Sequence, residues 1–131
     1  MREINIKVIP HCCQRYETPG DYWIDKEGVL QVRISRMGNR LYEFLVLFHE
    51  LLEWFMCEQA GIPIKDIDAF DIKYEKERDK GLHSKFSEPG NHPKAPYGFA
   101  HRFATKMERI VADKLRVRWE FYSLAVSALH K

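Results

Sequence analysis

The 131-residue sequence predicts a single α+β domain, in which a small antiparallel sheet near the N-terminus is followed by three or four packed helices. Three observations predict this arrangement. Apolar and polar residues alternate in short runs before residue 36, longer runs with helical spacing follow, and Gly38-Asn39 separates the two parts. A chain of this length can bury a core without disulfides. We therefore treat residues 1–131 as one domain.

The predicted strands lie within the first 36 residues. Over residues 4–8, Ile and Val alternate with Asn and Lys, which is the pattern of a half-buried strand, and Pro10 ends it. Residues 22–24 and 29–34 flank a turn-like Asp-Lys-Glu-Gly cluster at 25–28. This second region predicts a β-hairpin.

Residues 40–59 predict the central helix, which Gly61 closes as its C-cap. We expect a second helix over residues 64–80 and a third over residues 97–115. The tail is open to two interpretations: it alternates like a strand around Trp119, but residues 120–130 also fit a short amphipathic helix, which we favour. In the third helix one apolar face is formed by Phe99, Phe103, Met107, Ile110 and Val111.

The central helix carries three polar side chains in an otherwise apolar run over residues 45–56, namely His49, Glu50 and Glu53. A buried carboxylate is costly unless it is paired, protonated or bound to a metal. In a helix, His49 and Glu53 project side by side, while Glu50 lies on an adjoining face. The spacing predicts two ligands of a metal site with a carboxylate next to it.

Two ligands hold a metal weakly, so a third is expected, and His101 is the leading candidate. It lies near the start of the third helix, where Thr105 and Ala112 are small enough to let that helix approach the central one. Glu108 follows two turns later. Its carboxylate is either a hydrogen-bond partner of His49 or an ordinary surface acid.

The same side chains also have a structural interpretation. His49 and Glu53 can pair with each other or with Arg36 and Arg40, and His101 can be a hydrogen-bonded histidine of the core or the surface. In that case the chain is a non-enzymatic accessory protein, whose polar cluster joins its helices and whose surface binds another protein.

The order of a strand followed by a helix with Phe-His-Glu-Leu-Leu-Glu at residues 48–53 resembles minimal zincin metallopeptidases. The resemblance covers roughly residues 22–60. It implies a metal-dependent hydrolase in which His49 binds a divalent ion and Glu50 is the general base. With Glu53 and the separately identified candidate His101, the expected ligands are His49, Glu53 and His101. Glu53 stands where those enzymes have a second histidine. A carboxylate there adds negative charge, so Mn²⁺ or Mg²⁺ is an alternative to Zn²⁺.

Two further resemblances lead elsewhere. The His-Glu-Leu-x-Glu helix, the Asp-Ala-Phe-Asp segment and the Glu-Pro-Gly and Ala-Pro-Tyr loop are similar to small uncharacterised phage and bacterial proteins, which implies no function. Glu50 and Glu53, followed by Asp68 and Asp71, resemble the Mg²⁺ sites of MazG-like nucleotide pyrophosphohydrolases. Alternatively, Asp68 and Asp71 stabilise the start of their helix through its dipole.

Residues 81–98 contain the prolines Pro89, Pro93 and Pro96, so a long irregular loop is expected. It joins the second helix to the helix with His101. The loop is either a surface excursion or a lid that brings Glu88 and His92 over the site.

Composition narrows the classes of partner. The formal net charge is +2, with basic and acidic residues spread along the chain, which supports neither a nucleic-acid surface nor a membrane surface. The apolar run at residues 44–57 is shorter than the roughly 20 residues of a bilayer span. Three cysteines form no disulfide framework, and no secretory signal is expected, which indicates a reducing, cytoplasmic setting. No feature identifies the substrate.

Overall fold

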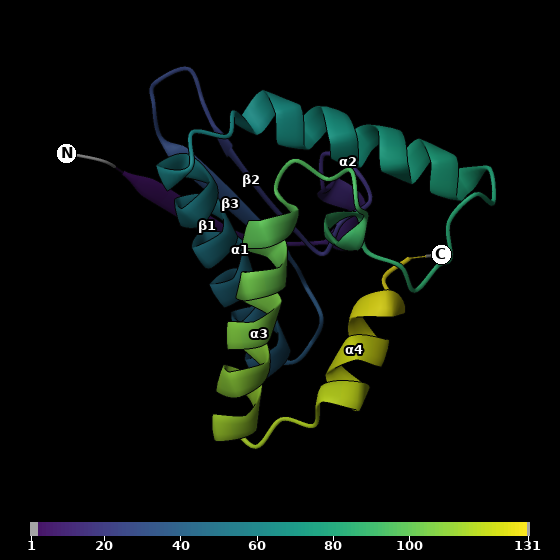
Figure 1. The fold of residues 1–131 in the computed structure, drawn as a ribbon. Coiled ribbons are helices and arrows are strands. Elements are labelled where there is room, and N and C mark those ends of the chain that lie inside the picture. The colour runs from purple at the N-terminus through teal and green to yellow at the C-terminus, as the bar shows by residue number, and fades with distance from the viewer. Residues whose placement is uncertain (1–2, 131) are drawn as a thin grey trace.

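The computed structural model describes residues 3–130, and it confirms an α+β arrangement in which a small sheet precedes the helices (Figure 1). The strands are β1 (Ile4–Ile9), β2 (Gly20–Ile24) and β3 (Leu30–Ser35), in the spatial order β1-β3-β2. β2 and β3 form the predicted antiparallel hairpin, with Tyr22 opposite Val32.

The sheet is mixed rather than antiparallel, because β1 runs parallel to β3, with Ile4 opposite Leu30 and Ile9 opposite Ser35. The prediction of an antiparallel sheet is therefore wrong for β1. After β1 the chain passes through the short 3₁₀ helix η1 (His11–Cys13) and enters β2, so that β3 lies between the two earlier strands. The alternation of polar and apolar residues predicts which side chains of a strand share a face. It is the same in parallel and antiparallel strands, so it does not predict the direction in which β1 pairs with β3.

Four helices follow the sheet in the described chain: α1 (Arg40–Gln59), α2 (Ile64–Asp79), α3 (Gly98–Lys114) and α4 (Trp119–Ser127). They agree with the predicted ranges, and the tail is helical. The Asn39 side chain accepts hydrogen bonds from the backbone N–H groups of Leu41 and Tyr42, which caps the start of α1. Gly61 has φ 74° just after α1, a left-handed conformation that favours glycine.

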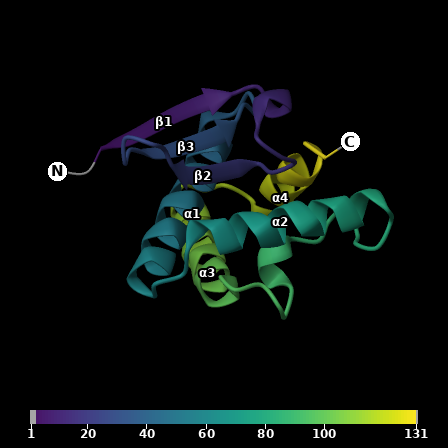
Figure 2. The ribbon, with the colours of Figure 1, turned by 90° about the horizontal axis from the view of Figure 1, so that it is seen from above.

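The core lies between the sheet and the helices, and α1, α2 and α3 lie on one side of the sheet (Figure 2). Leu30, Val32 and Ile34 of β3 are buried against this layer, together with Leu45 and Cys57 of α1. Cys57 is a free thiol that packs in the core as a small hydrophobe. None of the described helices is both long enough and apolar enough to cross a bilayer.

α3 packs against α1 through small side chains, because Ala100, Ala104 and Ala112 are fully buried. This agrees with the expected close approach of the two helices. The larger apolar face that the sequence predicts for α3 lies elsewhere: Phe99 and Phe103 are both 42% exposed. The helices therefore meet along their small residues.

Candidate metal centre

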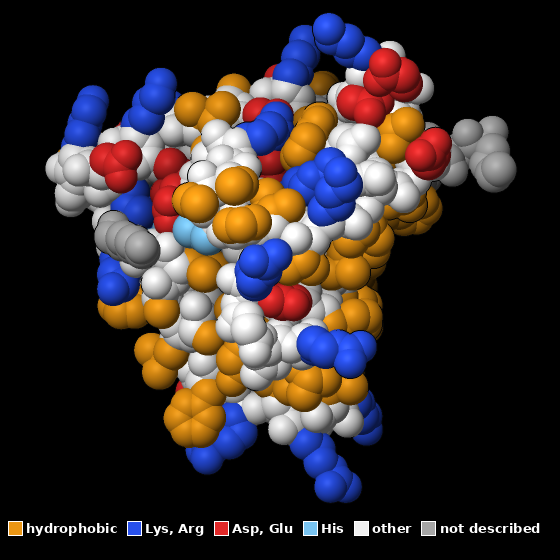
Figure 3. Space-filling model, turned by 180° about the vertical axis from the view of Figure 1, so that it is seen from behind, with side chains coloured by type: hydrophobic (Ala, Val, Ile, Leu, Met, Phe, Trp, Pro, Cys, Tyr) orange, Lys and Arg blue, Asp and Glu red, His pale blue; other side chains and the backbone are white. Residues whose placement is uncertain are grey.

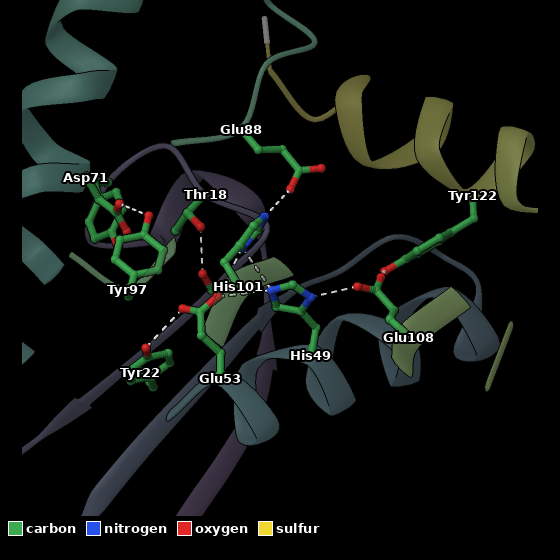
Figure 4. A network of polar contacts seen from close by, with 12 residues as sticks. Thr18, Tyr22, His49, Glu53, Asp71, Glu88, Tyr97, His101, Glu108 and Tyr122 are labelled. Carbon is green, nitrogen blue, oxygen red and sulfur yellow. Dashed lines mark hydrogen bonds and ion pairs between the residues drawn. The ribbon is translucent and has the colours of Figure 1, made fainter. Parts of the chain in front are cut away.

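The three predicted ligands converge in the structure. His49 and Glu53 project from α1 toward His101 at the start of α3 (Figure 4). The separations are 3.1 Å between His49 Nε2 and Glu53 Oε2, 3.1 Å between His101 Nδ1 and Glu53 Oε2, and 3.2 Å between the two nitrogens. The three ligand atoms form a nearly equilateral triangle.

This triangle has the size that a single metal ion requires. Ligand atoms about 2.0–2.1 Å from Zn²⁺ at tetrahedral angles stand about 3.3 Å apart. The residues are also shielded from solvent, since His49 is 8%, Glu53 5% and His101 8% exposed. The cluster can hold a metal ion, and a face of the triangle remains for a further ligand.

The outer nitrogen of each imidazole meets a carboxylate. His49 Nδ1 lies 2.7 Å from Glu108 Oε1, and His101 Nε2 lies 2.7 Å from Glu88 Oε2. A neutral imidazole that donates its only N–H outward presents a lone pair on its other nitrogen, here toward the centre of the triangle. Metal-binding histidines show this arrangement, in which the carboxylate orients the ring. The expected contact of Glu108 with His49 is present.

Tyrosines occupy the remaining oxygens of two carboxylates. Tyr22 of β2 donates to Glu53 Oε1 at 3.0 Å, which leaves Oε2 directed at the histidines. Tyr122 of α4 donates to Glu108 Oε2 at 2.5 Å. The site is thus held by β2, α1, α3, α4 and the loop before α3. The sequence gives no signal for the tyrosines, because their spacing matches no motif.

Hydrogen bonds set the charge of the cluster. Burial alone lowers the pKa of His101, but hydrogen bonds to Glu53 and Glu88 outweigh it and raise the pKa to about 9. Burial raises the pKa of Glu53, but the hydrogen bonds and charges of His101 and His49 outweigh burial and lower this pKa to about 2. The pKa of His49 lies well above its ordinary value, because its bonds to Glu108 and Glu53 exceed the effect of burial. Protons and a divalent ion therefore compete for these nitrogens.

Glu50 lines the same cleft as the three ligands. Within residues 3–130, no hydrogen bond or ion pair engages its carboxylate. Burial and then the neighbouring Glu53 raise its pKa well above the ordinary value, although His49 opposes the shift. Gly20 of β2 makes room for this side chain, since a Cβ there would lie 2.6 Å from Glu50 Cγ. Glu50 is a carboxylate in the cleft that is free to accept a proton.

The loop before α3 is part of the site. Besides the Glu88 contact, Gly90 packs on the imidazole of His101, and a Cβ at residue 90 would lie 2.2 Å from His101 Cγ. The expectation that His92 also lies over the site is wrong. Its ring packs 5.7 Å from Phe70 and 6.1 Å from Tyr74, centroid to centroid. Aromatic packing at the far end of α2 draws it away from the site.

The acids of α2 lie in the cleft wall but outside the ligand triangle. Both Asp68 oxygens accept from Arg15, at 3.2 Å each. Asp71 accepts from the hydroxyls of Tyr16 and Tyr97. Burial, which outweighs these hydrogen bonds, raises the pKa of Asp71 to about 7.

Two other expectations concern basic and thiol groups. The ion pairs of Glu53 are formed with His49 and His101, so the proposed pairing with Arg36 or Arg40 is not the one observed. Cys12 and Cys13 of η1 are exposed free thiols.

The cleft has a volume of about 150 Å³ and is closed on one side by α4 and on another by residues 85–90. Comparison of the chain with protein-family models, with curated proteins and with solved structures found no match.

Proposed function

We propose that this protein is a metal-dependent hydrolase of zincin-like architecture, in which His49, Glu53 and His101 bind one divalent ion and Glu50 is the general base. One observation carries the proposal: both imidazoles direct one nitrogen at the shared centre and the other at a carboxylate. Lone pairs that converge beside a carboxylate oxygen repel one another unless a proton or a metal ion lies between them, and one divalent ion would satisfy all three atoms at once.

The donor set favours Zn²⁺ or Mn²⁺ over Mg²⁺, because two of the three donors are imidazole nitrogens. When bound, such an ion supplies Lewis acidity and lowers the pKa of water toward neutrality. Glu53 adds negative charge, which makes the ion a weaker Lewis acid than one held by a second histidine in that position.

The chain itself supplies the proton transfer. Glu50 has a raised pKa and no competing partner among the described residues, so its carboxylate can take a proton from an attacking water and return it to a leaving group. Gly20 leaves the space in which Glu50 lies at the wall of the cleft.

The first test is metal content. The protein purified without added chelator should contain about one ion per chain, and His49→Ala, Glu53→Gln and His101→Ala should each lose it. His92→Ala is the matched control, because that histidine lies in the aromatic cluster and should leave metal content unchanged. A wild-type protein that binds neither Zn²⁺ nor Mn²⁺ on titration contradicts the proposal.

The second test separates binding from chemistry. Glu50→Gln should keep the metal but lose hydrolysis of any peptide or ester that the wild type cleaves, because the amide cannot accept the proton. Cleavage by Glu50→Gln at the wild-type rate would remove Glu50 from the mechanism.

A second candidate is a non-enzymatic protein in which the same cluster joins the helices. A continuous chain of hydrogen bonds supports this candidate, because each of its members already has a partner on the protein. The chain runs through Glu88, His101, Glu53, His49 and Glu108. Under that function, the cluster binds no metal at neutral pH. The nucleotide pyrophosphohydrolase alternative depends on Asp68 and Asp71, whose carboxylates already have partners on the chain, and we do not propose it.

A further inference from the structure

α1 and α3 pack against each other, and each helix also has exposed apolar side chains on the face that turns away from the candidate metal centre. These side chains are spaced three or four residues apart on each helix, which places them on one side. We call the surface that they form the seam surface, and it consists of Leu41, Phe44, Phe48, Leu52, Phe55, Phe99, Phe103, Met107 and Ile110.

The seam surface is exposed in the single chain. Phe44 is 47%, Phe55 50%, Phe103 42% and Ile110 46% exposed. Figure 3 views the molecule from behind, where the sheet lies, so the hydrophobic side chains down its right-hand edge are on the side of β1 and α1, and the front of α3 is out of view. The most apolar face of α3 thus points outward, while its alanine face packs on α1. A helix that leaves its larger apolar face uncovered lacks a partner for it.

We propose that the seam surface is the interface between two copies of this chain, related by a twofold axis. The exposed apolar area of its nine side chains is on the order of 600 Å². This is close to the roughly 800 Å² that each partner buries in an interface of standard size, and it equals the largest patches found on monomers. Neighbouring polar groups at the rim supply the remaining area.

The composition fits a protein partner. Interface centres are rich in aromatic residues and methionine and poor in charge, and the seam surface contains five phenylalanines, one methionine and no charged residue. Arg102 and Lys106 are exposed at its α3 edge. On α1, Arg40 at the first position of the helix adjoins this surface, while residues 41–57 contain no Lys or Arg. An amphipathic surface that binds anionic lipid has cations along both borders, so a second copy fits better than a bilayer.

Sedimentation equilibrium of the full chain over a wide range of concentration tests this interface. We expect a species of twice the 15.6 kDa chain mass, and monomers for Phe44→Asp and Phe103→Asp. Phe121→Asp is the matched control, since Phe121 of α4 is 51% exposed and lies outside the seam surface. That variant should remain dimeric. All three variants should keep the far-ultraviolet circular dichroism and the metal content of the wild type, because none of the three side chains touches the site.

The two variants lie on different helices, so that a folding defect in one does not prevent the test. A variant with altered circular dichroism is set aside, and the oligomeric state of the other variant then tests the interface. A wild type that stays monomeric at every concentration contradicts the proposal, as does a dimer that survives both folded variants. Vesicles with and without phosphatidylserine are added as a separate measurement. A monomeric wild type that co-sediments with anionic vesicles, and a Phe103→Asp variant that does not, would assign the seam surface to lipid.

Discussion

At the scale of single residues, glycine decides where two functional side chains can lie. Gly20 and Gly90 have no Cβ where Glu50 and His101 pack, and neither position needs a left-handed backbone. Their role is therefore space rather than conformational freedom. The two glycines act on different parts of the proposed chemistry.

Gly90→Ala should weaken metal binding by about 10-fold to 100-fold, because the added methyl displaces the His101 ring from the triangle. Gly20→Ala should instead keep the metal and lower hydrolysis, because it displaces Glu50. Metal affinity by chelator competition and turnover of a cleaved substrate measure the two effects. Gly28→Ala is the control: its backbone φ of 83° makes alanine costly for stability, yet nothing lies within 4 Å of its Cβ. Equal loss of metal in all three variants would mean a general folding effect.

The protonation of His101 predicts how pH acts on the site. Its pKa of about 9 in the metal-free protein exceeds the ordinary 6.5, so the folded state binds the proton more tightly than the unfolded state. The metal-free protein should therefore gain stability from this group below about pH 6.5 and lose that gain as pH rises through 9. Metal binding must release the proton, so metal affinity should rise with pH up to about 9.

Thermal unfolding at a series of pH values, with and without Zn²⁺, checks both predictions: the stability of the metal-free protein should fall as pH rises, and the stabilisation by Zn²⁺ should increase. The His101→Gln variant should lose the part of both dependences that comes from His101, while His49, whose pKa is also raised, keeps its own part. An affinity that is independent of pH between 6 and 9 would show that His101 is not a ligand.

At the scale of elements, the loop of residues 81–98 is tied to the site at its centre and to α2 at its start. Arg78 donates to the carbonyls of Ser84 at 2.6 Å and Ser87 at 2.8 Å. Glu88 and Gly90 follow the segment that Arg78 binds, and both contact His101. Ordering of His101 by a metal should therefore order the loop.

We expect added Zn²⁺ to slow proteolysis within residues 82–96 of the wild type, and to slow it less in Glu88→Gln, which weakens the contact to His101. Timed digestion followed by mass spectrometry of the fragments gives the rates. Cleavage after residue 115, between α3 and α4, serves as an internal comparison. The same rate in residues 82–96 with and without metal would show that the loop is not coupled to the site.

α4 is the second element that reaches the site from a distance. It contacts the ligand set through Tyr122, whose hydroxyl holds Glu108 and through it His49. Phe121 and Leu124 on its other side are 51% and 58% exposed. The last helix is thus fastened both by the Tyr122 hydroxyl and by apolar packing, since the Tyr122 ring belongs to the core and Trp119 and Val126 pack against it.

At the scale of the whole molecule, the candidate metal centre joins parts of the chain that are far apart in sequence. His49 and Glu108 are 59 residues apart, and His101 and Glu53 are 48 apart. An ion that binds only the folded chain stabilises it by mass action.

Free Zn²⁺ at 100 times its dissociation constant should stabilise the fold by about 2.7 kcal/mol. For a domain of this size, that corresponds to a rise in Tm of roughly 10 °C. Differential scanning calorimetry measures the shift, and His49→Ala should abolish it. A shift of the same size in His49→Ala would place the binding elsewhere.

Much of the fold is predictable because it depends on local patterns. The helix ranges follow from periodicity and from breakers such as Gly38, Gly61 and Pro63, and the β2–β3 hairpin follows from its turn residues. The pairing of His49 with Glu53 is also local, since residues four apart on a helix are neighbours. His101 was expected from its chemistry and position, and the structure brings it to these two side chains.

Three features were decided only by tertiary packing. The first is the parallel direction of β1. The second is the pair of tyrosine partners, Tyr22 and Tyr122. The third is the outward direction of the phenylalanines of α3. Periodicity identifies the side chains that share a face, but it does not identify the neighbour that the face meets. That choice depends on close packing between distant segments, where the alanines of α3 fit against α1 and leave its larger side chains outside.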